Sequence, residues 1–208
     1  MRRRFILYAA SVGLLVPLLA FGGEAAKTGV VKGAITVNGR PTSDAVVSVA
    51  GLPKKQLKTQ DSKLKTSKAV VDQRNVKFIP RVLPVLVGTT VEFPNNDKTW
   101  HNVYSKSEAK EFDLGLYPAG ETRSVTFDKP GVVRILCNVH PSMEAFIVVK
   151  DHPYFTTPDQ RGNYTLNRVP LGQRRLEVWH PEFGTRVVPF NLVREGEVLS
   201  VNVDLAKK

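Results

Sequence analysis

Short stretches that are apolar, or in which apolar and polar side chains alternate, recur along most of the chain and predict strands. Residues 29–37, 122–127 and 132–136 are examples, and the last of them is rich in β-branched side chains. Turn formers and prolines separate these stretches. No long segment shows the 3.6-residue apolar period of an amphipathic helix. The pattern therefore predicts an all-β protein made of β-sandwiches.

The first of these stretches ends in Asn38-Gly39, which is a strong signal for a tight turn. We expect residues 45–50, Ala-Val-Val-Ser-Val-Ala, to return from it as the second strand of a hairpin. A hairpin by itself cannot cover its apolar face. Its partners must therefore come from elsewhere in the chain.

Further strands are expected over residues 76–80, 82–87 and 145–149, and prolines place some of them at sheet edges. Residues 104–120 have a different pattern, with a polar start and a Pro-Ala-Gly turn at the end. This composition predicts a long loop, with a helical turn near residues 107–112.

A different hydrophobic pattern opens the chain, where three arginines precede an apolar run from Phe5 to Phe21. Small residues follow the run, so residues 1–23 have the composition of a secretory signal peptide. We expect the mature protein to be exported, and to be periplasmic if the source is a Gram-negative bacterium. A retained membrane anchor is the alternative, but Pro17 and the shortness of the run favour cleavage, which would leave no membrane span.

Side chains that bind soft metals gather at the end of the strand predicted over residues 132–136. Three of them lie within seven residues: Cys137, His140 and Met143. Pro141 prevents the strand from continuing, so these side chains lie on a loop. A second imidazole, His101, follows the turn formers of residues 95–99. Two His, one Cys and one Met make the trigonal His₂Cys set with a long axial Met that serves copper electron transfer.

Packing is the competing interpretation, because Cys, Met and His in an apolar segment often fill a core. Against it, Cys137 is the only cysteine, and Met143 is the only methionine besides the initiator. A single unpaired thiol in an exported chain is open to oxidation and needs an explanation. Copper ligation supplies one, so we expect a copper site.

At these residues the chain resembles the cupredoxins. Cys-x-x-His-x-x-Met is the short ligand loop of amicyanin-like proteins, and Asn-Asn-Asp followed by His-Asn-Val is similar to the segment that carries their upstream His ligand. The chain resembles still more closely the plastocyanin-like methylamine utilization proteins, in which a cupredoxin accompanies a carboxypeptidase-regulatory-like domain. The resemblance implies one type 1 copper ion, with a trigonal plane from His101, Cys137 and His140 and Met143 as the long axial ligand.

The resemblance also implies roles for neighbouring residues. Asn102 matches the residue that ties the two ligand loops together near the sulfur. Pro141, which has no N–H to donate, would form part of an apolar rim beside His140. In related proteins the His on this loop is the partly exposed edge through which electrons pass, so His140 takes that role. A closed set of four ligands leaves no open position for a substrate, which favours electron transfer over an enzyme.

The segments on either side of the copper motif predict a second unit. The tail over residues 151–208 resembles the later part of a carboxypeptidase-regulatory-like, transthyretin-like β-sandwich, and the opening residues 27–52 resemble its beginning. We therefore expect one discontinuous domain, with a Greek-key cupredoxin over residues 70–150 inserted between its second and third strands. Residues 53–69 would form a basic connector. Two tandem units are the alternative.

Charge bears on the choice of partner. The chain carries 30 Lys and Arg and 19 Asp and Glu, and loss of the three N-terminal arginines would lower its formal net charge from +11 to +8. Export and the lack of a nucleic-acid motif argue against nucleic acid. An acidic redox protein, such as a c-type cytochrome or a periplasmic dehydrogenase, fits better. The lysine-rich connector is expected to be solvated, with docking through Lys54, Lys55 and Lys58 as the alternative.

Two other functions stay open. A copper chaperone or store usually offers several Met or His ligands to Cu(I), and the mature chain has one Met. A structural or carbohydrate-binding module could hold copper incidentally, since a fold alone does not establish a function.

Overall fold

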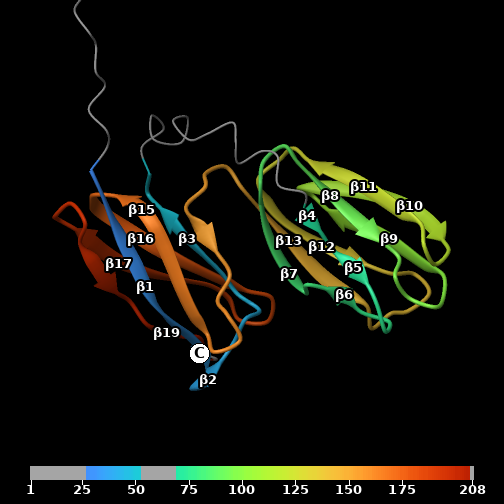
Figure 1. The fold of residues 1–208 in the computed structure, drawn as a ribbon, viewed down its shortest axis with the longest axis horizontal. Coiled ribbons are helices and arrows are strands. Elements are labelled where there is room, and N and C mark those ends of the chain that lie inside the picture. The colour runs from blue at the N-terminus through green and yellow to red at the C-terminus, as the bar shows by residue number, and fades with distance from the viewer. Residues whose placement is uncertain (1–26, 53–68, 207–208) are drawn as a thin grey trace, which may run out of the picture.

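The computed structural model of the protein describes residues 27–52 and 69–206. Within these ranges the chain consists of strands, turns and loops, which confirms the all-β prediction (Figure 1). The expected signal peptide over residues 1–23 lies outside the described residues, and so do Lys54, Lys55 and Lys58. None of the described residues lies in a helix of the length and apolar character that crossing a membrane requires.

One sandwich, called here the central sandwich, comprises residues 69–150. Its strands are β4 (Ala69–Val70), β5 (Asp72–Gln73), β6 (Phe78–Ile79), β7 (Val82–Leu86), β8 (Thr89–Pro94), β9 (His101–Ser107), β10 (Lys110–Tyr117), β11 (Thr122–Phe127), β12 (Gly131–Leu136) and β13 (Glu144–Lys150). One sheet has the order β10-β9-β12-β13-β7, and the other has the order β11-β8-β4. Pro84 lies in β7 at a sheet edge, where its missing N–H costs no ladder bond.

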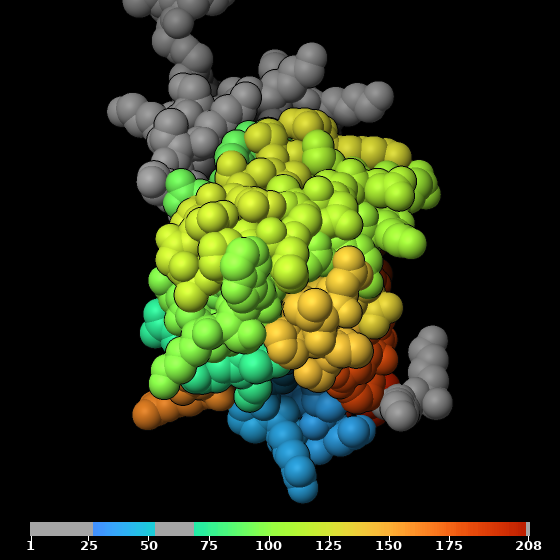
Figure 2. Space-filling model, turned by 90° about the vertical axis from the view of Figure 1, so that its right-hand side faces the viewer, coloured from blue at the N-terminus to red at the C-terminus, as the bar shows by residue number. Residues whose placement is uncertain are grey.

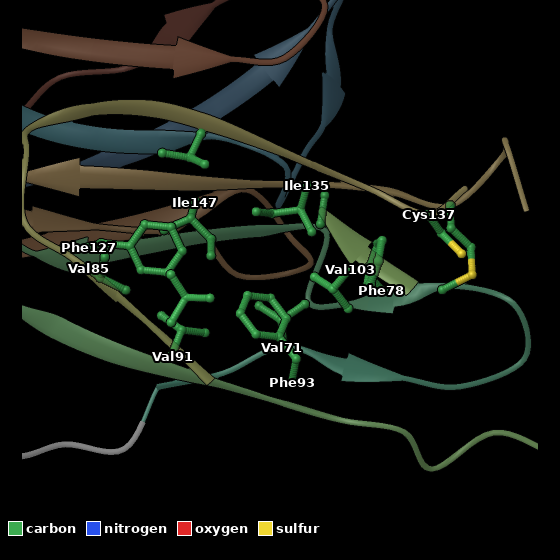
Figure 3. Close-up of a cluster of buried hydrophobic side chains, with 14 of the residues drawn as sticks. Val71, Phe78, Val85, Val91, Phe93, Val103, Phe127, Ile135, Cys137 and Ile147 are labelled. Atoms are coloured by element: carbon green, nitrogen blue, oxygen red, sulfur yellow. The ribbon is translucent and has the colours of Figure 1, made fainter. Parts of the chain in front are cut away.

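The inward-facing side chains of β12 extend the central core as far as the ligand loop. Val133 and Ile135 face inward because successive side chains of a strand point to opposite faces, and Cys137 continues the same series. Figure 3 shows Cys137 at one end of the buried cluster, beyond Ile135, with Phe93 and Phe127 farther inside. The thiol is therefore held by the packing of the central core.

The prediction of a loop over residues 104–120 is wrong. This segment forms most of a β-hairpin, in which β10 pairs with β9 from Lys110 opposite Ser107 to Tyr117 opposite His101. Strand β10 belongs to a mostly antiparallel sheet with one face open to solvent, and its residues on that face are mostly polar. Its other face carries Phe112 and Leu114, which pack against the core, and this alternation is the strand signal that the polar start concealed.

The second sandwich, called here the flanking sandwich, takes strands from both ends of the chain and has its own core. Its strands are β1 (Thr28–Val37), β2 (Arg40–Pro41), β3 (Val46–Ala50), β14 (Phe155–Thr156), β15 (Asn163–Pro170), β16 (Gly172–His180), β17 (Gly184–Leu192), β18 (Val198–Ser200) and β19 (Val203–Asp204). Strand β1 pairs with β15, β18 and β19, and the other sheet has the order β14-β3-β16-β17.

The hairpin predicted from β1 to residues 45–50 is only partly right. Asn38 and Gly39 have positive φ angles of 49° and 76°, as a tight turn requires, but only β2 returns against β1. Strand β3 lies instead in the opposite sheet, between β14 and β16. The reason is that β3 is buried on both faces: Val47 packs into the flanking core and Val46 packs against the central sandwich.

The two sandwiches meet at a small apolar junction. Val46 of β3, Val82 of β7 and Val148 of β13 are buried together, with Phe155 and Trp179 packed against them. The chain leaves the flanking sandwich after β3 and returns at β14, which pairs with β3. This pairing supports our proposal that residues 70–150 are inserted into a discontinuous domain of residues 27–52 and 151–208.

Candidate metal centre

Two imidazoles and the thiol meet at one end of the central sandwich. His101 begins β9, while Cys137 and His140 follow β12. The two Nδ1 atoms lie 3.1 Å apart, and Cys137 Sγ lies 4.0 Å from Nδ1 of His140. One ligand atom from each of the three residues lies within 4.8 Å of the others. His101 and Cys137 are buried and His140 is partly exposed, so the cluster opens to solvent on the His140 side.

A tight turn shapes the ligand loop of residues 137–143. The N–H of Met143 donates to the carbonyl of His140 at 2.9 Å. This bond turns the chain back into the sandwich, where Met143 is buried in the same core cluster as Cys137. Pro141 lies exposed beside His140 at the tip of the loop. The roles of Met143 as axial ligand and of Pro141 as part of the rim stay predictions.

Asn102 connects the two segments that carry the ligands. Its Oδ1 accepts the N–H of Asn138, which directly follows Cys137, at 3.3 Å. Its Nδ2 donates to Oδ1 of Asp113 at 2.6 Å, and the N–H of Gly115 donates to the same oxygen at 2.7 Å. Asn102 is thus satisfied on both sides, as a buried amide must be. The sequence pattern does not predict the contact of Asp113 with Asn102, because the β9/β10 hairpin that creates it lies in the segment expected to be a loop.

Asp97 holds the ring of His101, and this contact was also missed. Asp97 Oδ2 lies 2.9 Å from His101 Nε2, and it accepts the N–H of Val76 at 2.7 Å. With Nε2 donating to the carboxylate, Nδ1 keeps its lone pair and faces Cys137 and His140. A carboxylate four residues before a candidate ligand was the only available signal, and we interpreted it as a turn former.

The hydrogen bonds to Asp97 predict a pH dependence of stability. The N–H of Val76, together with those of His101 and Lys98, lowers the pKa of Asp97 from 3.8 to about 2. Because the folded pKa lies below the ordinary one, the carboxylate stabilises the fold above pH 4, and this contribution is lost as the pH falls from about 4 to about 2. Denaturant unfolding of the metal-free protein should show Asp97→Asn less stable than wild type at pH 6, with a smaller difference at pH 3.

Asp128→Asn is the matched control, since it removes a carboxylate that is 65% exposed at the surface. It should lower the stability little at either pH. An Asp97→Asn difference that is equally large at both values would show that the ionised carboxylate is not what stabilises this loop.

The donor set fits copper. Atoms bound to one metal at about 2.0–2.3 Å lie up to about 4 Å from one another, so the observed cluster needs only small side-chain adjustments. Imidazole and thiolate donors with a buried thioether nearby suit copper, whereas Ca²⁺ and Mg²⁺ require oxygen ligands. Two other histidines lie elsewhere: His152 and His180 are buried, and each accepts a backbone N–H through Nδ1.

The central sandwich is similar to known copper-binding proteins. A family model described as copper binding proteins, plastocyanin/azurin family, matches residues 65–150, which include all four expected ligands. Amicyanin-alpha of Methylorubrum extorquens is 30% identical over 78 residues, which cover 36% of this chain and 66% of that protein. The strands of the flanking sandwich lie outside the range of the family match.

Solved structures of copper proteins also match part of the chain. The copper-containing nitrite reductase of Thermus scotoductus has 30% identity and a TM-score of 0.39, and the match covers 40% of this chain and 22% of the reductase. A purple cupredoxin from Nitrosopumilus maritimus has 24% identity and a TM-score of 0.37, covering 40% of this chain and 100% of the cupredoxin.

Proposed function

Because the chain belongs, through residues 65–150, to the plastocyanin/azurin family of copper-binding proteins, we propose that it carries single electrons between redox proteins. The observation that carries the proposal is the compact cluster of His101, Cys137 and His140. A type 1 copper ion bound there supplies a Cu(I)/Cu(II) couple. The proposed role is transfer of electrons without chemistry on a substrate, because four protein ligands would leave no open position.

The residues around the cluster limit movement of the ligands. Asp97 orients the ring of His101, the central core holds Cys137, and Asn102 connects His101 to the ligand loop. Ligands held in one arrangement for both oxidation states lower the structural change that accompanies electron transfer. Such contacts with metal-binding side chains also tune the potential of the metal.

We place the route for electrons at His140, the partly exposed member of the cluster. Large apolar side chains are exposed next to the segments that carry the ligands: Trp100 precedes His101, Val139 precedes His140, and Leu116 pairs across the hairpin with Asn102. Their exposed fractions are 54%, 49% and 48%, respectively. Apolar side chains surrounding a redox centre suit a small, transient contact with another redox protein.

The proposed partners are a c-type cytochrome or a periplasmic dehydrogenase with an acidic surface, and the proposed location is the periplasm. Export follows from the composition of residues 1–23, and the acidic partner follows from the basic charge of the chain. A role in methylamine utilization is supported only by the resemblance of the sequence.

Leu116→Glu should slow electron transfer to a redox partner about tenfold, which corresponds to about 1.4 kcal/mol. The reason is that a charge would replace exposed apolar area on β10 opposite Asn102, the residue that follows His101, while leaving the ligands in place. Stopped-flow mixing of the reduced protein with an oxidised cytochrome measures the second-order rate constant. The visible spectrum should stay unchanged.

Val187→Glu is the matched control, because Val187 is also 48% exposed but lies on β17 of the flanking sandwich. It should leave the rate constant unchanged. Equal slowing by the two variants would move the docking surface away from His140.

A further inference from the structure

Arg81 connects the two sandwiches at the edge of the ligand loop. Its guanidinium contacts three carboxylates: Asp44 at 3.0 Å, Glu182 at 3.0 Å and Glu144 at 3.4 Å. Asp44 and Glu182 belong to the flanking sandwich, whereas Glu144 belongs to the central one. A planar guanidinium with five N–H donors can serve several carboxylates at once, which an ammonium on a single stem does less well.

Glu144 occupies a particular place relative to the copper ligands. It directly follows Met143, and it pairs across β12 and β13 with Leu136, which directly precedes Cys137. Glu144 and Leu136 therefore form the base from which the ligand loop projects. Arg134 holds the other oxygen of Glu144, with Nε at 2.6 Å. The carboxylate at the base of the loop is thus held between two arginines, and one of them is anchored in the flanking sandwich.

The backbone around Arg81 ties the same region to the apolar junction. The carbonyl of Arg81 accepts the N–H of Phe146 at 2.8 Å, and the guanidinium carbon lies 5.9 Å from the centre of the Phe146 ring. The Phe146 ring in turn meets Trp179 of the flanking sandwich edge to face, with centroids 5.4 Å apart. In Figure 2 the blue and red segments of the flanking sandwich border the gold segment, whose colour corresponds to residues around the ligand loop.

We propose that the flanking sandwich braces the copper-ligand loop through Arg81, which acts as a positioning residue on Glu144. Asp44 and Glu182 hold the guanidinium, the guanidinium and Arg134 hold Glu144, and Glu144 fixes the end of the loop next to Met143. The redox consequence rests on the proposed electron-carrier function, while the brace itself is a property of the protein with or without metal. In this proposal the flanking sandwich helps to hold the copper ligands in position.

Three variants test the brace. Arg81→Gln removes one positive charge, whereas the double variant Asp44→Asn, Glu182→Gln removes two negative charges. Lys110→Gln is the control, since it removes an ion pair with Asp128 in the central sandwich. Lys110 begins β10, whereas the end of β10 near the ligands is Tyr117. The first readout is hydrogen exchange of the Met143 amide in the metal-free protein, because this amide closes the ligand loop. The second is electron self-exchange of the copper protein.

Both brace variants should speed exchange at Met143 about two- to fivefold, the range that loss of partly exposed ion pairs produces. Both should also slow self-exchange, although their charge changes have opposite signs. Lys110→Gln should do neither. A purely electrostatic effect would move the reduction potential in opposite directions and leave the exchange rate of Met143 unchanged, which would overturn the proposal.

The brace and the electron-carrier function can fail separately. Faster exchange at Met143 in a protein without a type 1 copper spectrum would leave the brace standing and remove the proposed function. A normal spectrum, with Met143 exchange equal in all variants, would retain the proposed function and remove the brace. Lower melting temperatures without faster Met143 exchange would mean that Arg81 only joins the sandwiches, which also contradicts the proposal.

Discussion

Replacing Cys137 with serine is expected to abolish the intense visible absorption of the Cu(II) protein and the narrow copper hyperfine splitting of its electron-spin-resonance spectrum. Both signals arise from a thiolate bound to copper, and Cys137 is the only cysteine in the chain. The serine hydroxyl is a harder and more weakly basic donor, so copper should bind more weakly and give an ordinary Cu(II) spectrum. Absorption and electron-spin-resonance spectra of the purified Cu(II) protein measure the change.

Ser142→Ala is the control for this substitution, because Ser142 is an exposed residue of the same loop. It should leave both spectra as they are. A wild-type protein that is colourless with Cu(II), or that gives a tetragonal signal, would contradict the electron-carrier proposal. Copper handling or a structural role would then be the better explanation.

Phe93→Ala should lower the free energy of unfolding by about 3–5 kcal/mol, the usual cost of removing a buried phenylalanine ring. Phe93 is fully buried in the central core (Figure 3). Its ring centroid lies 6.3 Å from that of Phe112. Because the same core holds Cys137, we also expect a broader copper signal. Denaturant unfolding followed by tryptophan fluorescence measures the first effect, and the electron-spin-resonance spectrum of the Cu(II) protein measures the second.

Leu176→Ala provides the comparison in the other sandwich, since Leu176 is fully buried in the flanking core. It should cost about 2–5 kcal/mol, with the copper spectrum retained. An unfolding free energy that Phe93→Ala leaves unchanged would show that the packing around Phe93 contributes little. If Leu176→Ala abolished the copper spectrum, the two cores would not fold independently of each other.

The strands were predictable where the alternation was strong and the partners did not matter. Residues 132–136 lie in β12, as their richness in β-branched side chains predicts, and Pro141 lies on the loop as expected. Residues 104–120 were mistaken for a loop because an edge strand needs apolar side chains on only one face. Strand β3 was expected to pair with β1 but pairs with β14 and β16. The apolar sequence of a buried strand does not indicate which sheet it joins.

What the sequence alone determined is which side chains are candidate copper ligands. A single cysteine, His140 and Met143 at fixed spacing, with His101 after a turn, predict a soft-metal donor set, and the structure brings His101, Cys137 and His140 together. Only the tertiary structure decided which groups hold that set in place. Asp97 contacts the ring of His101, Asp113 supports Asn102, and Arg81 joins the flanking sandwich to Glu144 at the base of the ligand loop. The physical reason is that metal ligands are recognised by their element and spacing, whereas these carboxylates and arginines become partners only when distant strands bring them within hydrogen-bonding distance.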